Sequence, residues 1–374
     1  MSKKLHSDLY HTIALLQTPL VGDKTARTLI AHCGSAKAVF EASKKELAQI
    51  NGIGLAISEN IKAFNGWNTT DVEMVFLEKN DVQASIYHEN TYPHRLKNFD
   101  DSPVILYQKG SWNANKQARI VGIIGTRKPT AYGRDFTERL VEGLKPYNTT
   151  VISGLAYGID VAAHRAALEH IIPTVGVLAH GLNRIYPPAH FRTAERMWQE
   201  GGALLTEFPS YFSPDRENFP RRNRIVAGLC DALIVAETAT KGGSMITVKI
   251  ANNYNKDVFA LPGRTSDMVS VGCNLLIKSH QAALIETVED LLYVMRWEQT
   301  ENKKNAIQPE LFMDLSDEER KVLNLLRTNE NNELGIDTLT FQSQIPASRL
   351  AAILLGMEFR GLIQPLPGKR YAIR

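Results

Sequence analysis

Six short apolar runs, separated by segments of helical periodicity, constrain the fold of this chain most strongly. The runs are 120–124, 150–153, 174–179, 203–207, 232–237 and 258–262. Their apolar residues are mostly consecutive and do not alternate with polar ones, which is typical of strands buried on both faces. Strands that alternate with helices predict an α/β fold with a doubly wound, mostly parallel sheet between two helix layers.

Four segments are expected along the 374 residues. Residues 1–66 show short helical patterns joined by turns at Gly22 and Gly52, which predicts a helical, helix-hairpin-helix-like (SAM-like) domain. Residues 67–298 hold the sheet, and 299–308 are polar without periodicity, as in a linker. Residues 309–374 show three helical patterns, a capping box at Ser316 and Glu319, and a final hairpin-like turn, which together predict a winged helix.

Composition limits the classes of function. With 44% hydrophobic and 22% charged residues the chain is typical of a globular protein, and a formal net charge of +3 is too small to identify a partner. The three cysteines lie far apart, which argues against a metal site or disulfide framework and favours a cytoplasmic protein. No apolar stretch is long enough for a membrane span. No cofactor and no metal are expected.

Two glycine turns follow the first two apolar runs. Gly125, Thr126 and Arg127 end the first, and Ser153 and Gly154 open the second. Turns at the carboxyl ends of strands expose backbone N–H groups and helix N-termini, where an anionic group is stabilised. Neither turn has the G-x-G-x-x-G or P-loop spacing, so dinucleotide and triphosphate binding lack motif support. A guanidinium such as that of Arg127 can bind phosphate through two hydrogen bonds, although a surface arginine in a tight turn is an alternative.

An arginine-rich run is the other candidate binding element. It comprises Phe219, Pro220, Arg221, Arg222, Asn223 and Arg224, just before an apolar helical segment. Cations at a helix N-terminus oppose the helix dipole, which suggests an anionic ligand, and the phenyl ring offers a stacking surface for a base. A solvated or ion-paired charge run is the alternative.

A third glycine turn, with Lys241, Gly243 and Ser244, follows the run 232–237. All these loops are expected at one edge of the sheet, in a single cationic groove that Arg127 and Arg224 share.

Three acidic or basic residues have competing interpretations. Asp160 and His164 lie four residues apart on one helix face, which allows an acid–base pair or half of a metal site, but capping by Asp160 is favoured. Glu237 ends a strand and is the one candidate acid for an enzyme acting on nucleotides.

Taken together, these motifs resemble the DNA-processing protein A family (DprA, also called Smf). The matching segments are YP at 92–93, PVILY at 103–107, GTR at 125–127, SGLAYGID at 153–160 with His164, YP at 186–187, FPRRNRIVAG at 219–228, GS at 243–244 with Thr247, LPG at 261–263 and GCNLLI at 272–277. They span roughly residues 90 to 280 in the family's order.

The resemblance implies an extended Rossmann-like domain that binds single-stranded DNA, forms homodimers and loads RecA onto DNA in natural transformation, without a catalytic step. It implies DNA contacts at Arg127, the 219–224 stretch and the turns at Ser153 and Gly243. The alternative is a nucleotide-hydrolysing enzyme of related fold. The predicted winged helix has eight basic and nine acidic residues from 309 to 374, which favours protein contact over duplex binding. A transcription regulator that uses this module is therefore disfavoured, and the N-terminal helices are equally consistent with duplex contact and with packing.

Overall fold

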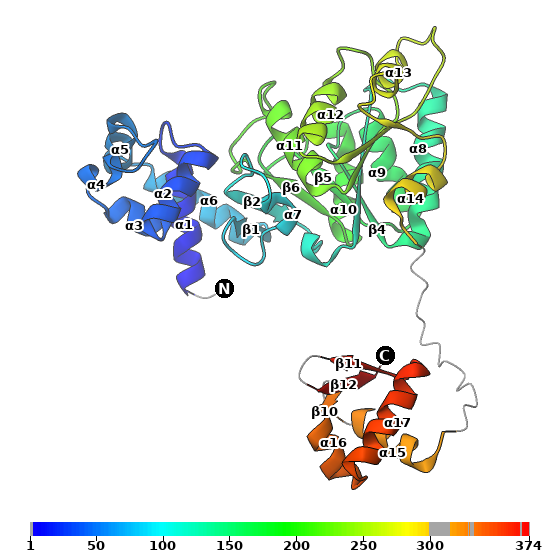
Figure 1. Cartoon of the computed structure of the whole chain (residues 1–374). Coiled ribbons are helices and arrows are strands. Elements are labelled where there is room, and N and C mark those ends of the chain that lie inside the picture. Colours follow the sequence, from blue (N-terminus) through cyan, green and yellow to red (C-terminus); the bar gives the residue numbers. More distant parts are fainter. Residues whose placement is uncertain (1–2, 299–314, 328, 330–332, 367–368, 374) are drawn as a thin grey trace. The chain divides into compact units, whose positions relative to one another are not determined.

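The computed structural model describes residues 3–298, 315–327, 329, 333–366 and 369–373. It divides into two compact units, Met1–Glu301 and Asn302–Arg374, which are coloured from blue to yellow and from orange to red in Figure 1. The predicted linker 299–308 lies outside the described residues. The boundary predicted at 66/67 falls inside the first unit.

A nine-stranded sheet forms the centre of the first unit. Its strands are β1 (Val82–Ile86), β2 (Ile105–Lys109), β3 (Arg119–Ile124), β4 (Thr149–Ser153), β5 (Thr174–Val177), β6 (Ala203–Thr206), β7 (Ala232–Val235), β8 (Asp257–Ala260) and β9 (Ala283–Leu284). Their order is β1-β2-β6-β5-β4-β3-β7-β8-β9. The seven strands from β6 to β9 pair in parallel, whereas β2 pairs antiparallel with both β6 and β1. The predicted mostly parallel sheet is confirmed, and β1, β2 and β9 are additional strands.

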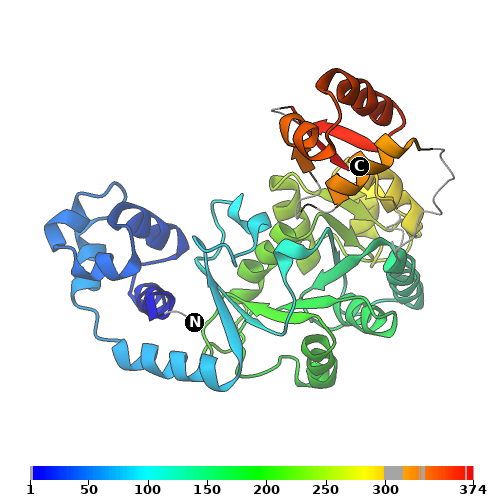
Figure 2. The same cartoon turned by 90° about the horizontal axis from the view of Figure 1, so that it is seen from below.

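Helices cover both faces of this sheet (Figure 2). They are α7 (His94–Lys97), α8 (Ala131–Leu144), α9 (Ile159–Glu169), α10 (Phe191–Gln199), α11 (Asn218–Leu229), α12 (Gly243–Asn253), α13 (Val271–Lys278) and α14 (Val288–Met295), with the short 3-10 turns η1 (Ala114–Lys116), η2 (Lys145–Tyr147) and η3 (Pro188–His190).

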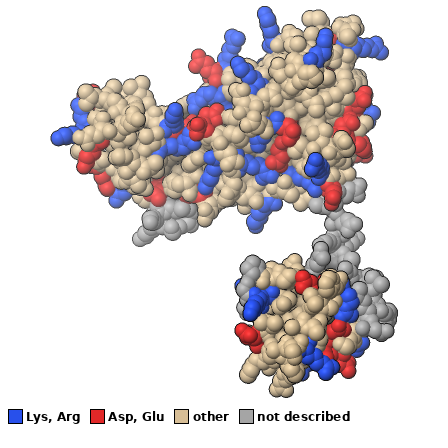
Figure 3. Space-filling model, viewed as in Figure 1, with Lys and Arg blue, Asp and Glu red and all other residues tan. Residues whose placement is uncertain are grey.

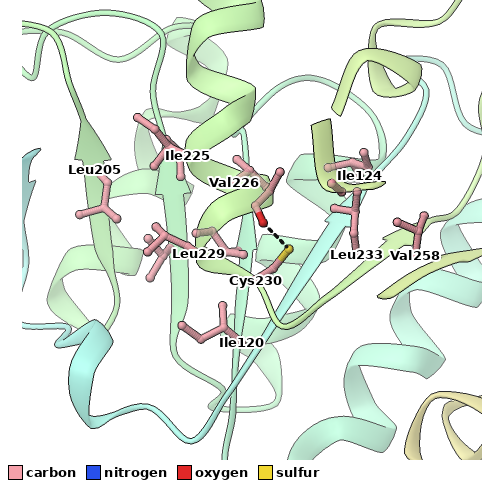
Figure 4. Close-up of a cluster of buried hydrophobic side chains, with 14 of the residues drawn as sticks. Ile120, Ile124, Leu205, Ile225, Val226, Leu229, Cys230, Leu233 and Val258 are labelled. Carbon is pink, nitrogen blue, oxygen red and sulfur yellow. Dashed lines mark hydrogen bonds between the residues drawn. The ribbon is translucent and has the colours of Figure 1, made fainter. Parts of the chain in front are cut away.

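Consecutive residues of β3 point into two different cores, as a strand covered on both faces requires. Ile120 and Ile124 pack against α11 and α12, and Figure 4 shows Ile225, Val226 and Leu229 of α11 against this face. Val121 and Ile123 belong to the opposite core, which α8, α9 and α14 complete. This double burial explains the consecutive apolar residues of the run.

The N-terminal helices pack against the β1–β2 end of the sheet. They are α1 (Lys3–Gln17), α2 (Asp23–Cys33), α3 (Ala36–Glu41), α4 (Lys44–Ala48), α5 (Leu55–Lys62) and α6 (Trp67–Lys79). One apolar core joins them to the strands, since Leu29 and Ile61 share it with Ile86 and Tyr107. The boundary expected at residue 66 therefore does not separate two hydrophobic cores.

The second unit has the predicted winged-helix elements. They are α15 (Asp317–Arg327), β10 (Glu333–Gly335), α16 (Ile336–Ser343), α17 (Ala347–Phe359), β11 (Ile363–Leu366) and β12 (Arg370–Ile373), with the strands in the order β10-β12-β11. The capping box is present, because the Glu319 amide donates to Ser316 Oγ and the Ser316 amide donates to Glu319 Oε2. The turn expected at 367–368 lies outside the described residues.

On the face that Figure 3 shows, basic and acidic side chains are interspersed. An anion-binding site on this face therefore depends on local geometry. Across the described residues, no helix has the length and hydropathy needed to cross a membrane.

Candidate nucleic-acid interface

The order of the strands creates a crevice beside β3. From β3 the chain adds β4, β5 and β6 on one side, and β7, β8 and β9 follow on the other side. The loops that leave β3 and β7 therefore run in opposite directions, and a space opens at the carboxyl ends of these strands. Doubly wound folds place their ligands at this position.

A pocket of about 440 Å³ occupies this position. The loops after β3, β4 and β7 and the first turns of α11 and α12 form its walls. Its lining residues are Ile124, Gly125, Thr126, Arg127, Gly154, Ala156, Asp160, Phe219, Pro220, Arg222, Asn223, Val226, Thr238, Ala239, Gly242, Gly243, Ser244, Ile246 and Thr247. The structure thus brings together nine of the thirteen predicted site residues: Gly125, Thr126, Arg127, Gly154, Phe219, Arg222, Asn223, Gly243 and Ser244.

The turn after β3 is held tightly against the turn after β4. The Thr126 carbonyl accepts a hydrogen bond of 3.2 Å from the amide of Ile159. Gly158 has a φ of +84°, and a Cβ there would lie 2.2 Å from the Thr126 oxygen. Only glycine fits both the backbone conformation and the contact, so the two turns form one rigid ridge.

Arg127 lies on this ridge with its side chain exposed. Its guanidinium carbon is 5.7 Å from the centre of the Phe219 ring, a cation–π distance. No salt bridge to Arg127 occurs within the described part of the chain. The pocket therefore combines an unpaired guanidinium and a half-buried aromatic ring, which suits a phosphate and a base respectively.

Arg222 lies below the ridge and is only 5% exposed. Its Nη1 donates to the carbonyl oxygens of Gly154 and Val177, at 2.6 and 2.5 Å. A Cβ on Gly154 would lie 2.1 Å from this nitrogen, which explains the glycine. Arg222 therefore supports the turn after β4 and adds positive charge at the floor of the pocket.

Asp160 also supports this turn. Its Oδ2 accepts hydrogen bonds from the amides of Gly154 and Ala156, at 3.2 and 3.4 Å. Burial raises the pKa of Asp160, and the attraction of Arg222 partly opposes that rise. The prediction that Asp160 caps its helix is wrong: the N-cap of α9 is Gly158, which makes no side-chain hydrogen bond, and Asp160 instead stabilises the turn before the helix.

His164 does not pair with Asp160. Its Nδ1 lies 2.7 Å from Thr174 Oγ1, and burial lowers its pKa to about 3, so the ring is neutral. Within the described residues no group of His, Cys, Asp and Glu could hold a metal ion.

Two of the predicted arginines face away from the pocket, which corrects the expectation that Arg127 and Arg224 share a groove. Arg224 Nη2 is 2.6 Å from Glu207 and 3.3 Å from Asp23, and Arg221 Nη2 is 3.1 Å from the same Glu207. The cause is the start of α11 at Asn218, several residues earlier than expected. On a helix the residues 219 and 222 share one face, and 221 and 224 share another.

Ser153 and Lys241 do not line the pocket either. Ser153 is fully buried, and its Oγ donates to the Ile123 carbonyl at 2.6 Å, so the hydroxyl points into the sheet. Lys241 is exposed beside the third turn. Thr238, Ala239 and Thr247 also line the pocket, although they were not among the predicted site residues. Their position directly after β7 or in the first turns of α12 was the available signal.

Glu237 does not reach the pocket. Its carboxylate accepts hydrogen bonds from the Thr130 amide and hydroxyl, at 2.9 and 2.5 Å, and is 1% exposed. Its carbonyl oxygen accepts from the Thr126 amide at 2.7 Å. Glu237 therefore holds the loop that carries Arg127, and its carboxylate is not positioned to act on a ligand.

Comparisons with known proteins establish the family of this chain. A family model described as DNA recombination-mediator protein A matches residues 83–296. The chain belongs to this family. Two further family models match the same chain. A DprA winged helix domain matches residues 308–369, and a helix-hairpin-helix motif matches residues 12–70. The resemblance to the DprA/Smf family and the predicted fold class are both confirmed.

Individual recombination-mediator relatives cover most of the chain. Protein Smf of Escherichia coli is 30% identical over 95% of this chain and 93% of its own. The X-ray structure of DNA processing protein A from Streptococcus pneumoniae is 29% identical with a TM-score of 0.65, covering 78% of this chain and 98% of that one. A structure of DNA processing protein A from Helicobacter pylori, which describes a single-stranded DNA binding mode, is 30% identical with a TM-score of 0.52, covering 58% and 98%.

Proposed function

We propose that this member of the recombination-mediator family binds single-stranded DNA in the pocket beside β3. The observation that carries the proposal is the unpaired, exposed Arg127 above the Phe219 ring, at the rim of a pocket of about 440 Å³. The single-stranded DNA binding described for the Helicobacter pylori relative supports it.

The geometry favours a single strand over a duplex. A flexible strand can turn one base into the pocket against Phe219 while its phosphate meets Arg127, whereas a duplex must first unpair and unstack that base. Stacking on Phe219 and a phosphate contact at Arg127 do not distinguish one base from another. Binding is therefore expected to be independent of sequence.

Fluorescence anisotropy with single-stranded and duplex oligonucleotides of equal length tests this function. Arg127→Ala is expected to weaken single-strand binding about tenfold or more, because a charge-assisted phosphate contact contributes about 1.5–3 kcal/mol. Arg139→Ala, an exposed arginine of α8 outside the pocket, is the matched control. If about four phosphates are neutralised, the logarithm of affinity falls with the logarithm of salt at a slope of about −3. Equal binding of both DNA forms, or no effect of Arg127→Ala, would contradict the proposal.

The proposed role of bound DNA is to receive RecA during natural transformation, with the protein acting in the cytoplasm as a homodimer. Family membership supports this part of the proposal. The measurement is the rate at which RecA filaments form on DNA coated with single-strand-binding protein, with and without this protein. If this protein does not raise the rate of RecA filament formation, the RecA part of the proposal is overturned. If light scattering gives the mass of a monomer, the dimer part is overturned.

We further propose that the protein acts without a catalytic step. The orientation of Glu237 toward Thr130 supports this, since the alternative of a nucleotide-hydrolysing enzyme depended on that acid. Incubation with nucleoside monophosphates is expected to release no free base. If the wild type releases free base and Glu237→Gln abolishes that release, the enzymatic alternative would be restored.

A further inference from the structure

A second groove lies on the other side of the ridge that carries Arg127. It has a volume of about 370 Å³ and is bounded by the loop 127–129, the first turns of α8, and the N-terminal half of α9. Four cations line it: Arg127, Lys128, Arg134 and Arg165. None of its lining residues is acidic. None of the predicted site residues except Arg127 belongs to it.

The four cations of the second groove are not neutralised by neighbours. All four side chains belong to exposed residues, and within the described ranges none forms a salt bridge. Arg134 Nη1 donates to the Pro129 carbonyl at 2.8 Å, which holds this arginine at the edge of the groove. Like charges gathered without counter-ions repel one another, so a bound polyanion would relieve their repulsion.

An aromatic ring completes the second groove. Tyr157 is 48% exposed, and its ring packs edge-on against His190 with the centroids 4.8 Å apart. One side of the ring is thus supported by the protein while much of its surface remains open. Unpaired cations next to an exposed aromatic ring are the combination that single-stranded nucleic acid requires, since its phosphates and unstacked bases are both accessible.

The second groove adjoins the pocket beside β3. Arg127 lines both, and Gly158 of the second groove lies tightly against Thr126 of the pocket. We infer that a single DNA strand whose base enters the pocket crosses this ridge, and that the next nucleotides bind the second groove through Lys128, Arg134, Arg165 and Tyr157. This inference rests on the proposed function and extends the site to a longer stretch of the same strand.

The test compares a long and a short oligothymidine, of about 20 and about 4 nucleotides, with the full-length protein. Arg134→Ala combined with Arg165→Ala is expected to weaken binding of the long strand about tenfold and to leave the short strand unchanged. Loss of two phosphate contacts should make the salt slope shallower by about 1.4. Arg139→Ala, on the same helix as Arg134 but outside the second groove, is the matched control, and thermal melting checks that each variant is folded.

A positional measurement complements affinity. In photo-crosslinking, iodouracil is placed at successive positions of the long strand. We expect one position to crosslink to Tyr157 and a different position to crosslink to Phe219. The crosslink must be assigned to the residue itself, because Gly154 and Ala156 of the pocket lie in the same tryptic peptide as Tyr157. The inference is overturned if the Arg134→Ala/Arg165→Ala variant binds the long strand as tightly as Arg139→Ala does and no crosslink forms at Tyr157. The proposed function remains intact in that case, provided that binding still depends on Arg127. Polyglutamate serves as a probe for an acidic protein partner. If the Arg134→Ala/Arg165→Ala variant loses polyglutamate binding but keeps DNA binding, the second groove binds an acidic protein and the inference is overturned. If the wild type binds no single strand at all, the proposed function fails and the inference with it.

Discussion

Helix α11 presents arginines on two faces that differ in their surroundings. On one face Phe219 and Arg222 border an open pocket, and on the other Arg221 and Arg224 form ion pairs with Glu207. Adjacent cations in the sequence thus have separate physical roles, because the helical period separates them by about 100° per residue. A basic run identifies a binding surface only once the helix that contains it has been located.

The largest expected effect is on the ion-paired face. Glu207 and Arg224 have side chains only 3% and 10% exposed, so Arg224→Ala leaves a buried carboxylate without its main partner. We expect a loss of about 3–5 kcal/mol in the free energy of unfolding. Urea denaturation measures this loss, and Arg221→Ala, whose side chain is 52% exposed, should cost less than about 1 kcal/mol.

The same Arg224→Ala variant discriminates between the two faces. While it remains folded, its affinity for single-stranded DNA should match that of the wild type, because Arg224 does not line the pocket. Weaker DNA binding without loss of stability would show that the two faces act as one surface.

The next effect concerns the support below the pocket. Gly154→Ala places a methyl group 2.1 Å from Arg222 Nη1 and must displace that guanidinium from two carbonyl oxygens. We expect stability to fall by about 2 kcal/mol and DNA affinity to fall as well, since charged hydrogen bonds contribute about 1.5–3 kcal/mol. Gly243→Ala is the control for stability, because a Cβ there meets no atom within 4 Å. An equal loss of stability of the two variants in urea denaturation would refute this role of Arg222.

Much of the fold was predictable because the signals were local. Runs such as 120–124 are apolar throughout, and that pattern directly reports burial on both faces. β1 was missed because Val82, Ala84 and Ile86 alternate with more exposed residues, as expected where helices cover one face only. Alternation over five residues was present in the sequence and would have predicted this strand.

The site was predictable only in part, because its details depend on distant contacts. Pro220 is compatible with the first turn of a helix, and that signal would have placed the start of α11 before the arginines. No local pattern shows that Gly154 faces Arg222, which is 68 residues away along the chain, or that Ser153 points into the sheet. Such contacts are fixed by strand order, which the sequence did not specify.

A smaller effect is expected from the aromatic ring on the pocket face. Phe219→Ala should weaken single-stranded DNA binding by about 1–2 kcal/mol, because stacking on one base contributes about 1–3 kcal/mol. Phe212→Ala is the matched control: Phe212 is 36% exposed and stacks on Phe208, next to the ion-paired face. Anisotropy of both variants measures the difference. If Phe212→Ala is as damaging as Phe219→Ala, the strand does not distinguish the two faces.

The smallest expected effect concerns Glu73, a buried carboxylate that, unlike Glu207, forms no salt bridge within the described part of the chain. Glu73 of α6 is 1% exposed and accepts hydrogen bonds from the Ser210 amide, at 3.0 Å, and hydroxyl, at 2.6 Å. Burial raises the pKa of Glu73 above its ordinary value, and the bonds from Ser210 oppose the rise only in part. Because the folded state binds this proton more tightly than the unfolded state, the contribution of Glu73 to stability falls as pH rises from about 4.3, its ordinary pKa, through the raised pKa.

Glu73→Gln removes that titration. The stability of the variant relative to the wild type should therefore increase with pH and then become constant above the raised pKa. Urea denaturation from about pH 4 to pH 7 measures this difference. The opposite trend, with the wild type gaining stability over the variant as pH rises, would mean that the Ser210 hydrogen bonds outweigh burial. Glu73 would then anchor α6 to the loop after β6 as a stabilised carboxylate.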